Sequence, residues 1–514
     1  MDNNSNLFAV NIPADGLFLA ILSKANGDFS EDNCRRIITS YIDRYLDADP
    51  DIILLNVCYR RSLTPSKVID SYLYDIEIGA DGETLKTISP VTDGVSKYFS
   101  SFFSCARVLL QNGVDIFKIL TEYLRPNKCK VYFSVRMNDG HYINNPAINS
   151  SFALKDGGKH TIDGDGASLD FSQKEVQDYF FRYIKELIEN YDIDGIELDW
   201  LRYPTVLPLE KRADLQILND YMLSVCDLIN GYNNKLGLAV RVLAHEQDNL
   251  NNGLDVCRWI ADGIIDTVTI ENFYIPTNYE MPVADWRAKI AEKNTAENGY
   301  RLLCGSDWGV SCVRGYNIAM NPDLVRGFKA ESLCNGADGV YLFNYFEEDD
   351  TSSYELVSED NGTAYLKNCF SERLNAVRDP SLLPRRYVHI GESNDRYPIA
   401  LSSKECYEFL YRFRKPFNIC EIVVGCSDDV CISASLNGNA DQILLQNNPV
   451  YDGFEYIPDT EIGKKSEFIY AVSQTSPFVK SAVLPIKEDG LAKITLKNNG
   501  SQSVNLLWIE LYFK

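Results

Sequence analysis

Short apolar runs alternate with amphipathic stretches along the chain up to about residue 370. This alternation is typical of a parallel sheet whose strands are connected by helices. Most of the runs are almost continuously apolar, as expected for strands that are covered on both sides. Eight runs can be counted, and they begin at Gly16, Asp51, Lys130, Gly195, Leu236, Asp266, Arg301 and Gly339. Eight such strands predict an α/β fold of the closed (β/α)8 type, a TIM barrel.

The segment before the fourth run has the clearest helical pattern. Its apolar residues recur at the spacing of one helix face: Val176, Phe180, Ile184, Leu187 and Ile188. Ser172 and Glu175 have the S-x-x-E spacing of a capping box, which predicts the start of this helix.

The pattern changes after about residue 385 to short alternating segments separated by Gly, Asn, Asp and Pro. Such segments predict an all-β domain of the β-sandwich type. We therefore expect a barrel over residues 1–380, a linker at RDPSLLPRR, and an accessory sandwich over residues 385–514. The sandwich could be a carbohydrate-binding module, but its alternation is explained by packing alone, so a structural role is the preferred interpretation.

The net charge of the chain limits the classes of binding partner that are expected. The formal net charge is −23 and the isoelectric point is near 4.7. Nucleic acids and anionic membranes bind through clustered Lys and Arg, so neither is an expected partner. A neutral ligand such as a sugar is compatible with the acidic net charge. The sequence is also compatible with a homo-oligomer.

Neither the first residues nor the cysteines indicate export. MDNNSNLFAVNIPADG lacks the basic start and apolar stretch of a signal peptide, and no window reaches the roughly 20 apolar residues of a membrane span. The 14 cysteines are scattered without CxxC pairs, which favours reduced, buried thiols. A cytoplasmic protein is expected, although a chain trimmed of its signal peptide would look the same.

The segment YDIDGIELDWLRYP carries the strongest chemical signal. Glu197 and Asp199 are two apart on an expected strand, so both face the barrel interior. Burial and like-charge repulsion drive one of two such carboxyl groups to keep its proton, which suits proton transfer. Both could instead belong to structural ion pairs. Three arginines are the candidate partners: Arg136, Arg202 and Arg241.

The same segment resembles a known family. DGIELDWLRYP is similar to the DGI-x-x-D-x-x-RYP segment of the barrels called family 10 glycosylhydrolase-like proteins. Three further segments agree with that family: LDFSQKEVQDYFFRYIKELIENYDIDG, SVRMNDGH and GADGVYLFNYF. The resemblance covers most of residues 50–350 in order and implies a hydrolase that acts on glycosidic bonds.

The strand also resembles the D-G-x-D-x-D-x-E signature of family 18 chitinases, with one departure. Leu201 stands where those enzymes have their catalytic Glu. Their substrate-assisted mechanism requires a carboxylic acid at that position to protonate the glycosidic oxygen, so a chitinase is disfavoured. The acid must come from elsewhere in the chain.

Glu271, at the end of the sixth run, is the best partner for Asp199 because a barrel site takes its groups from several strand ends. A fourth- and sixth-strand pair is also the arrangement of several retaining glycosidase clans. We expect Asp199 as nucleophile and Glu271 as acid/base. Glu271 could instead be a rim carboxylate bonded to Asn272 or a backbone amide, and Asp307 is the alternative acid unless it only shapes a turn.

The remaining site candidates are polar or aromatic groups near strand ends, suited to binding sugar hydroxyls or stacking on a ring face. The expected substrate-binding residues are Arg136, Asn138, His141, Glu197, Arg202, Asp307, Trp308 and Asn344. His141 and Asp139 could suggest a metal, but no spaced His or Cys accompanies them, so no metal site is expected. Nucleotide-binding, serine-hydrolase and zinc-protease motifs are absent from the sequence, and no cofactor is expected.

These observations together predict a glycosidase that cleaves an oligosaccharide, polysaccharide or glycoconjugate, with a retaining mechanism preferred. One alternative is a carbohydrate-binding barrel without turnover. Another is a glycan lyase or transglycosylase on the same scaffold, whose positioned groups would be similar. The sugar, the linkage and the choice between chain ends and interiors are not encoded in a readable motif.

Overall fold

The computed structural model describes most of the chain, with gaps. The described residues are 6–71, 76–78, 85–87, 102, 105–106, 108–109, 112–140, 143, 148–164, 166–232, 236–272, 281–293, 299–307, 309–312, 316–319, 322–345, 370–378, 386–390, 399–412, 419–438, 442–447, 478–486 and 491–513.

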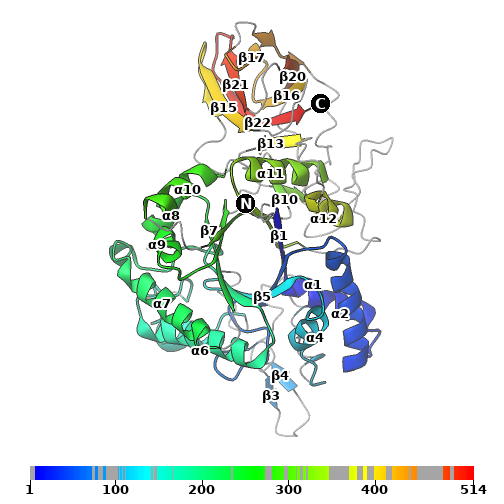
Figure 1. Cartoon of the computed structure of the whole chain (residues 1–514), viewed down its shortest axis with the longest axis vertical. Coiled ribbons are helices and arrows are strands. Elements are labelled where there is room, and N and C mark those ends of the chain that lie inside the picture. The colour runs from blue at the N-terminus through cyan, green and yellow to red at the C-terminus, as the bar shows by residue number, and fades with distance from the viewer. Residues whose placement is uncertain are drawn as a thin grey trace.

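Eight parallel strands close into a barrel inside a ring of helices (Figure 1). Around the barrel they are β1 (Leu7–Ile12), β12 (Gly339–Phe343), β9 (Arg301–Asp307), β8 (Thr267–Glu271), β7 (Gly237–Leu243), β6 (Gly195–Asp199), β5 (Lys130–Arg136) and β2 (Ile52–Cys58). The predicted TIM barrel is confirmed, and seven of its eight strands match the predicted runs.

The first strand was predicted in the wrong place. β1 is LFAVNI, whereas the run that begins at Gly16 lies within helix α1 (Ala14–Lys24). Most of this helix is buried, including Leu17, Phe18 and Ile21. Its sequence therefore does not alternate between an apolar and a polar face as an amphipathic helix does. A short apolar run of this kind cannot be distinguished from a buried strand by periodicity.

The described helices connect the barrel strands or follow the last of them. After α1 they are α2 (Glu31–Leu46), α4 (Ile116–Leu124), α5 (Ser151–Leu154), α6 (Lys174–Asn190), α7 (Gln216–Asn230), α8 (Glu246–Asn251), α9 (Val256–Ala261), α10 (Val283–Glu292), α11 (Pro322–Cys334) and α12 (Phe370–Arg378). Two short 3-10 turns are η1 (Lys155–Gly157) and η2 (Leu209–Lys211). Two hairpins lie outside the barrel, β3 (Ile76–Ile78) with β4 (Leu85–Thr87) and β10 (Gly309–Cys312) with β11 (Tyr316–Ala319).

Helix α6 has the predicted apolar stripe but not the predicted capping box. It begins at Lys174, and its N-cap residue Gln173 makes no side-chain capping bond. The Ser172 hydroxyl instead donates to Asp170 Oδ1 at 2.6 Å. The S-x-x-E spacing identified the start of the helix to within two residues, although the hydrogen bonds differ from those of a capping box.

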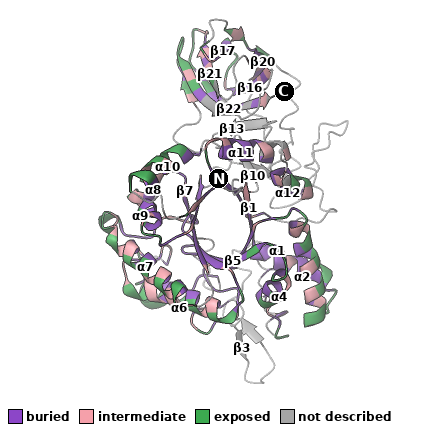
Figure 2. Cartoon of the chain, in the orientation of Figure 1, coloured by how far each residue is buried: buried purple, intermediate pink, exposed green. Residues whose placement is uncertain are grey.

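The barrel strands are buried on both faces (Figure 2). Their outward side chains pack with the helices in one large apolar core. Inward side chains form a second apolar cluster, which begins near the strand starts and reaches the end of β12 at Phe343: Leu7, Ala9, Ile52, Leu54, Tyr132, Ala239, Leu303, Tyr341 and Phe343. Gly195 and Gly237 leave room for the Tyr132 ring, since a Cβ at either position would overlap it. The N-terminal part of the barrel interior is thus filled by apolar groups.

Two antiparallel sheets follow the barrel. One has the order β13 (Arg386–Ile390), β22 (Val504–Phe513), β16 (Ile419–Cys426), β20 (Phe478–Pro485) and β19 (Gln446–Asn447), with β14 (Ile399–Leu401) also paired to β22. The other has the order β15 (Cys406–Arg412), β21 (Leu491–Asn498), β17 (Ile432–Leu436) and β18 (Ile443–Leu444). The predicted β-sandwich is confirmed, and Figure 1 shows it beside α11, which β13 and β15 contact.

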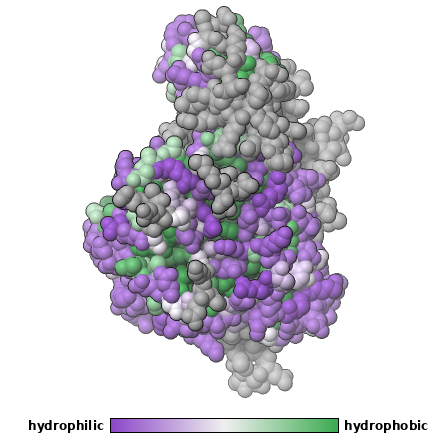
Figure 3. Space-filling model, in the orientation of Figure 1, coloured by the Kyte–Doolittle hydropathy of each residue, from purple (hydrophilic) through white to green (hydrophobic). Residues whose placement is uncertain are grey.

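The outer helices present a predominantly hydrophilic surface (Figure 3). Each helix in the described ranges is too short or too polar to cross a membrane. Twelve described cysteines form no disulfide. The cellular location and the domain limits at residues 380 and 385 stay predictions.

Candidate active site

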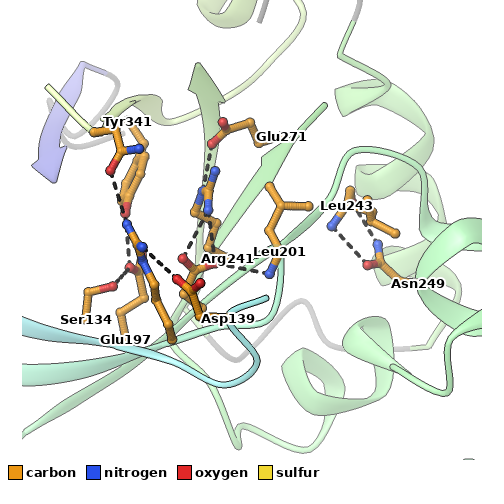
Figure 4. A network of polar contacts seen from close by, with 12 residues as sticks. Ser134, Asp139, Glu197, Leu201, Arg241, Leu243, Asn249, Glu271 and Tyr341 are labelled. Atoms are coloured by element: carbon orange, nitrogen blue, oxygen red, sulfur yellow. Dashed lines mark hydrogen bonds and ion pairs between the residues drawn. The ribbon is translucent and has the colours of Figure 1, made fainter. Parts of the chain in front are cut away.

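One buried arginine joins carboxylates from two strands at the C-terminal end of the barrel (Figure 4). Arg241 Nε donates to Glu271 Oε2 at 2.8 Å, and Arg241 Nη1 donates to the two Asp199 carboxylate oxygens at 3.0 and 3.1 Å. The three side chains are at most 3% exposed. The two predicted catalytic residues are therefore brought together, and the ion pair between Asp199 and Arg241 that the sequence left open is present.

The strand register accounts for this arrangement. Asp199 is the direct partner of Arg241 across β6 and β7, and Glu271 is the partner of Leu243 across β7 and β8. Residues two apart on a strand share a face, so Arg241 and Leu243 both point inward. The guanidinium of Arg241 also lies over the Phe343 ring of β12, with its central carbon 3.5 Å from the ring centroid. This cation–π contact fixes the arginine from a third side.

Asp199 and Glu271 differ in how fully they are held. Both Asp199 oxygens are engaged by Arg241, and Oδ1 also accepts a hydrogen bond from the Leu201 amide at 3.0 Å. Glu271 is bound through Oε2, and no described residue hydrogen-bonds its Oε1. Asp199 is thus fixed in position, whereas Glu271 keeps one oxygen for another partner.

Gly305 of β9 makes room for the Glu271 carboxylate. A Cβ at position 305 would overlap Glu271 Oε2 and would lie 3.0 Å from the Glu271 Cβ. Real Cβ atoms essentially never show contacts under 3.0 Å, such as the one with Oε2. Glycine at this position therefore allows Glu271 to reach Arg241.

Glu197 is the third buried carboxyl group of the site and is 1% exposed. Its Oε1 accepts hydrogen bonds from the Ser134 hydroxyl at 2.7 Å and the Tyr341 hydroxyl at 3.0 Å. Burial, and then the charge of Asp199, raise the pKa of Glu197 from 4.5 to about 8. The sequence predicts that either Glu197 or Asp199 keeps its proton. With this raised pKa, Glu197 is the one that does so at neutral pH.

Arg136 forms a second buried ion pair beside the first. Its Nη1 donates to Asp139 Oδ2 at 2.8 Å and its Nη2 to Asn344 Oδ1 at 3.2 Å. Its guanidinium carbon lies 4.4 Å from the Tyr59 ring centroid. Asn344 has φ of 51°, in the left-handed region that asparagine tolerates better than most residues. Two predicted substrate-binding residues, Arg136 and Asn344, therefore contact each other.

The other predicted binding residues lie around this network. Arg202 lies with its guanidinium carbon 5.3 Å from the Phe343 ring centroid, and Asp307 is the half-buried last residue of β9. The Asn138 amide donates to the carbonyls of Tyr203 and Thr205, so it holds the loop after β6. His141 and Trp308 lie outside the described residues.

Sequence reasoning missed several inward residues at this end of the barrel. They are Asn11, Asn56, Ser134, Tyr341 and Phe343, together with Asp139 as the partner of Arg136. A usable signal existed for the two asparagines, because each stands near the end of an otherwise apolar strand, LFAVNI or IILLNVC. Within the described ranges, no cluster of three His, Cys, Asp or Glu side chains could hold a metal ion.

Comparisons with known proteins give only distant similarities. No protein-family model and no curated protein matches the chain. Among solved structures, a cycloisomaltooligosaccharide glucanotransferase from Paenibacillus sp. is 10% identical with a TM-score of 0.34, over 99% of this chain and 58% of that one. An α-L-fucosidase isoenzyme 2 from Paenibacillus thiaminolyticus is 11% identical with a TM-score of 0.41, over 72% of this chain and 48% of that one.

A maltogenic α-amylase from Thermotoga neapolitana is 11% identical with a TM-score of 0.37, over 96% of this chain and 99% of that one. This chain spans about half the length of the first two structures. Similarities at this level carry no conclusion about activity. The assignment to the TIM-barrel fold rests on the closed ring of eight parallel strands.

Proposed function

We propose that the protein hydrolyses glycosidic bonds of an oligosaccharide, polysaccharide or glycoconjugate at the C-terminal end of its barrel. The observation that carries this proposal is the pair of buried carboxylates, Asp199 and Glu271, bound to one guanidinium. Glycosidases place two carboxyl groups on either side of the scissile bond. The resemblance of DGIELDWLRYP to glycosylhydrolase-like barrels points the same way.

The different environments of the two carboxylates suggest their roles. Asp199, held by Arg241 and the Leu201 amide, is placed to attack the anomeric carbon. Glu271, with Oε1 available, would give a proton to the leaving oxygen and later remove one from the water that hydrolyses the glycosyl-enzyme. Asp199 and Glu271 bind neighbouring nitrogens of one guanidinium. This favours a short distance between the two carboxyl groups, about 5 Å as in retaining enzymes, over the roughly 6.5–9.5 Å of inverting enzymes.

A second candidate function is a sugar-binding barrel without turnover. The observation in its favour is that Arg241 engages both oxygens of Asp199, as in a purely structural ion pair. A lyase or transglycosylase would use the same positioned groups, and product analysis would separate it from a hydrolase.

The experiment is hydrolysis of a panel of aryl glycosides and oligosaccharides by wild type, Asp199→Asn and Glu271→Gln. Both variants are expected to lose about 10²- to 10⁴-fold in kcat. Asp262→Asn, which changes an exposed carboxylate paired with Arg258, is the matched control and should keep full activity. Azide should restore turnover to Asp199→Ala with inverted product stereochemistry, and to Glu271→Ala with retained stereochemistry.

The outcomes separate the candidates. A wild type that binds sugars and releases nothing would support the binding barrel. Hydrolysis that both variants perform at the wild-type rate would show that other residues are catalytic.

A further inference from the structure

Two asparagine side chains at the C-terminal end of the barrel are buried without a hydrogen-bonding partner among the described residues. Asn11 of β1 is 0% exposed and Asn56 of β2 is 1% exposed. In both side chains, the amide nitrogen and the amide oxygen lack a hydrogen bond to any described residue. Buried amide groups are almost always hydrogen-bonded, so two such groups close together require an explanation.

Both side chains point into the barrel. Leu7 and Ala9 of β1, and Ile52 and Leu54 of β2, belong to the inward apolar cluster. Asn11 and Asn56 continue these alternating positions toward the strand ends, so they share the inward face. Asn11 pairs in register with Leu54 of this cluster, and Asn56 lies two residues further along the neighbouring strand.

The two amides lie across the barrel from Arg241 and Glu271, and β2, which carries Asn56, is two strands from β6, which carries Asp199. In the closed strand order, β1 is four strands from β7, which carries Arg241, and β2 is four strands from β8, which carries Glu271. Asn56 is also the register partner of Ser134, which hydrogen-bonds Glu197. The second Glu197 oxygen, Oε2, is likewise buried without a partner among the described residues.

We propose that Asn11 and Asn56 form a subsite that binds neighbouring hydroxyl groups of one neutral sugar ring. A side-chain amide supplies two N–H donors and one oxygen acceptor, and a hydroxyl group both donates and accepts. Two adjacent amides therefore match a pair of ring hydroxyls. The inference deepens the proposed function, on which it rests: the sugar whose anomeric carbon faces Asp199 extends across the barrel to the amides.

The test uses Asn11→Leu and Asn56→Leu, because leucine has a similar shape and no polar atoms. Asn249→Leu is the matched control. Asn249 is equally buried, but its amide is fully engaged, accepting from the Leu243 amide and donating to the Leu243 and His245 carbonyls. Binding is measured by calorimetry with free glucose, galactose, mannose, xylose and fucose, and folding by thermal unfolding without sugar.

A subsite predicts opposite effects on binding and on stability. The wild type should bind at least one of the five sugars, and each Leu substitution at positions 11 and 56 should weaken that binding by about tenfold or more. The melting temperature of the free protein should stay the same or rise, since an unpaired buried amide gives it no stability. Asn249→Leu should instead lower the melting temperature by several degrees.

The results distinguish this inference from the proposed function. Sugar binding that is lost in the two variants, in a protein that hydrolyses nothing, would support the subsite and refute the hydrolase. Hydrolysis with unchanged KM and unchanged sugar binding in both variants would overturn the subsite and leave the hydrolase standing. A fall in melting temperature like that of Asn249→Leu, without a change in binding, would likewise overturn it.

Discussion

Replacing Glu197 with glutamine should stabilise the barrel in a strictly pH-dependent way. Glutamine copies the shape of the protonated carboxyl group, and its oxygen can accept the hydrogen bonds of Ser134 and Tyr341. In the folded protein Glu197 keeps its proton up to a pKa of about 8, whereas the unfolded chain loses it near 4.5. Between these values the folded state binds more protons, so raising the pH favours unfolding of the wild type.

The pKa difference sets the size of this effect. The wild type should lose about 1.4 kcal/mol of unfolding free energy per pH unit relative to Glu197→Gln, up to about 5 kcal/mol in total. The loss should begin near pH 4.5 and be complete a little above pH 8. Below pH 4.5 both states carry the proton, and the wild type and the variant should have similar stability.

Urea unfolding at pH 5, 6, 7 and 8 measures this difference. Tryptophan fluorescence is a suitable probe because Trp200, Trp259 and Trp286 are fully buried in the barrel. Glu189→Gln, at a half-exposed position on α6, is the matched control. A difference between wild type and Glu197→Gln that stays constant across the pH series would refute the raised pKa. Full hydrolytic activity of Glu197→Gln would in addition agree with Glu271, and not Glu197, as the proton donor.

Substitutions at two further positions test the network around Glu271. Arg241→Met should lower the free energy of unfolding in urea by about 3–5 kcal/mol because two buried carboxylates lose their counter-ion, and Arg241→Lys should lower it less. A loss below about 1 kcal/mol in Arg241→Met would contradict the buried ion pairs of Arg241 with Asp199 and Glu271. Gly305→Ala should displace Glu271 and lower kcat by about tenfold or more while sugar binding is kept, since the added methyl group overlaps Glu271 Oε2. Unchanged kcat in Gly305→Ala would mean that the position of Glu271 does not matter.

The sequence predicted the barrel well because most of its strands are apolar runs separated by helices with a polar face. The exception is instructive. Helix α1 is buried on nearly all sides, so the run at Gly16 has no helical stripe, and it was assigned as a strand in place of β1. The sequence pattern therefore does not place Asn11 in the barrel, because LFAVNI lies before the predicted first strand.

The closeness of Asp199 and Glu271 was predictable from the sequence, but their shared partner was not. The two residues were expected to converge because strand ends in a barrel converge, which is a property of the fold. The choice of Arg241 over Arg136 or Arg202 depends on strand register and side-chain distances, and periodicity does not contain these. The same limit applies to Gly305, whose role becomes visible only when the Glu271 side chain is placed beside it.

The charges at the C-terminal end of the barrel explain why a proton on Glu197 matters to the whole site. Three guanidinium groups surround the Phe343 ring, with their central carbons 3.5, 5.3 and 5.9 Å from its centroid: Arg241, Arg202 and Arg136. Three carboxyl groups pair with Arg136 or Arg241: Asp139, Asp199 and Glu271. Ionising Glu197 would add a further buried negative charge beside Asp199. The uncharged amides of Asn11 and Asn56, which have no hydrogen-bonding partner among the described residues, fit a neutral sugar better than an ion.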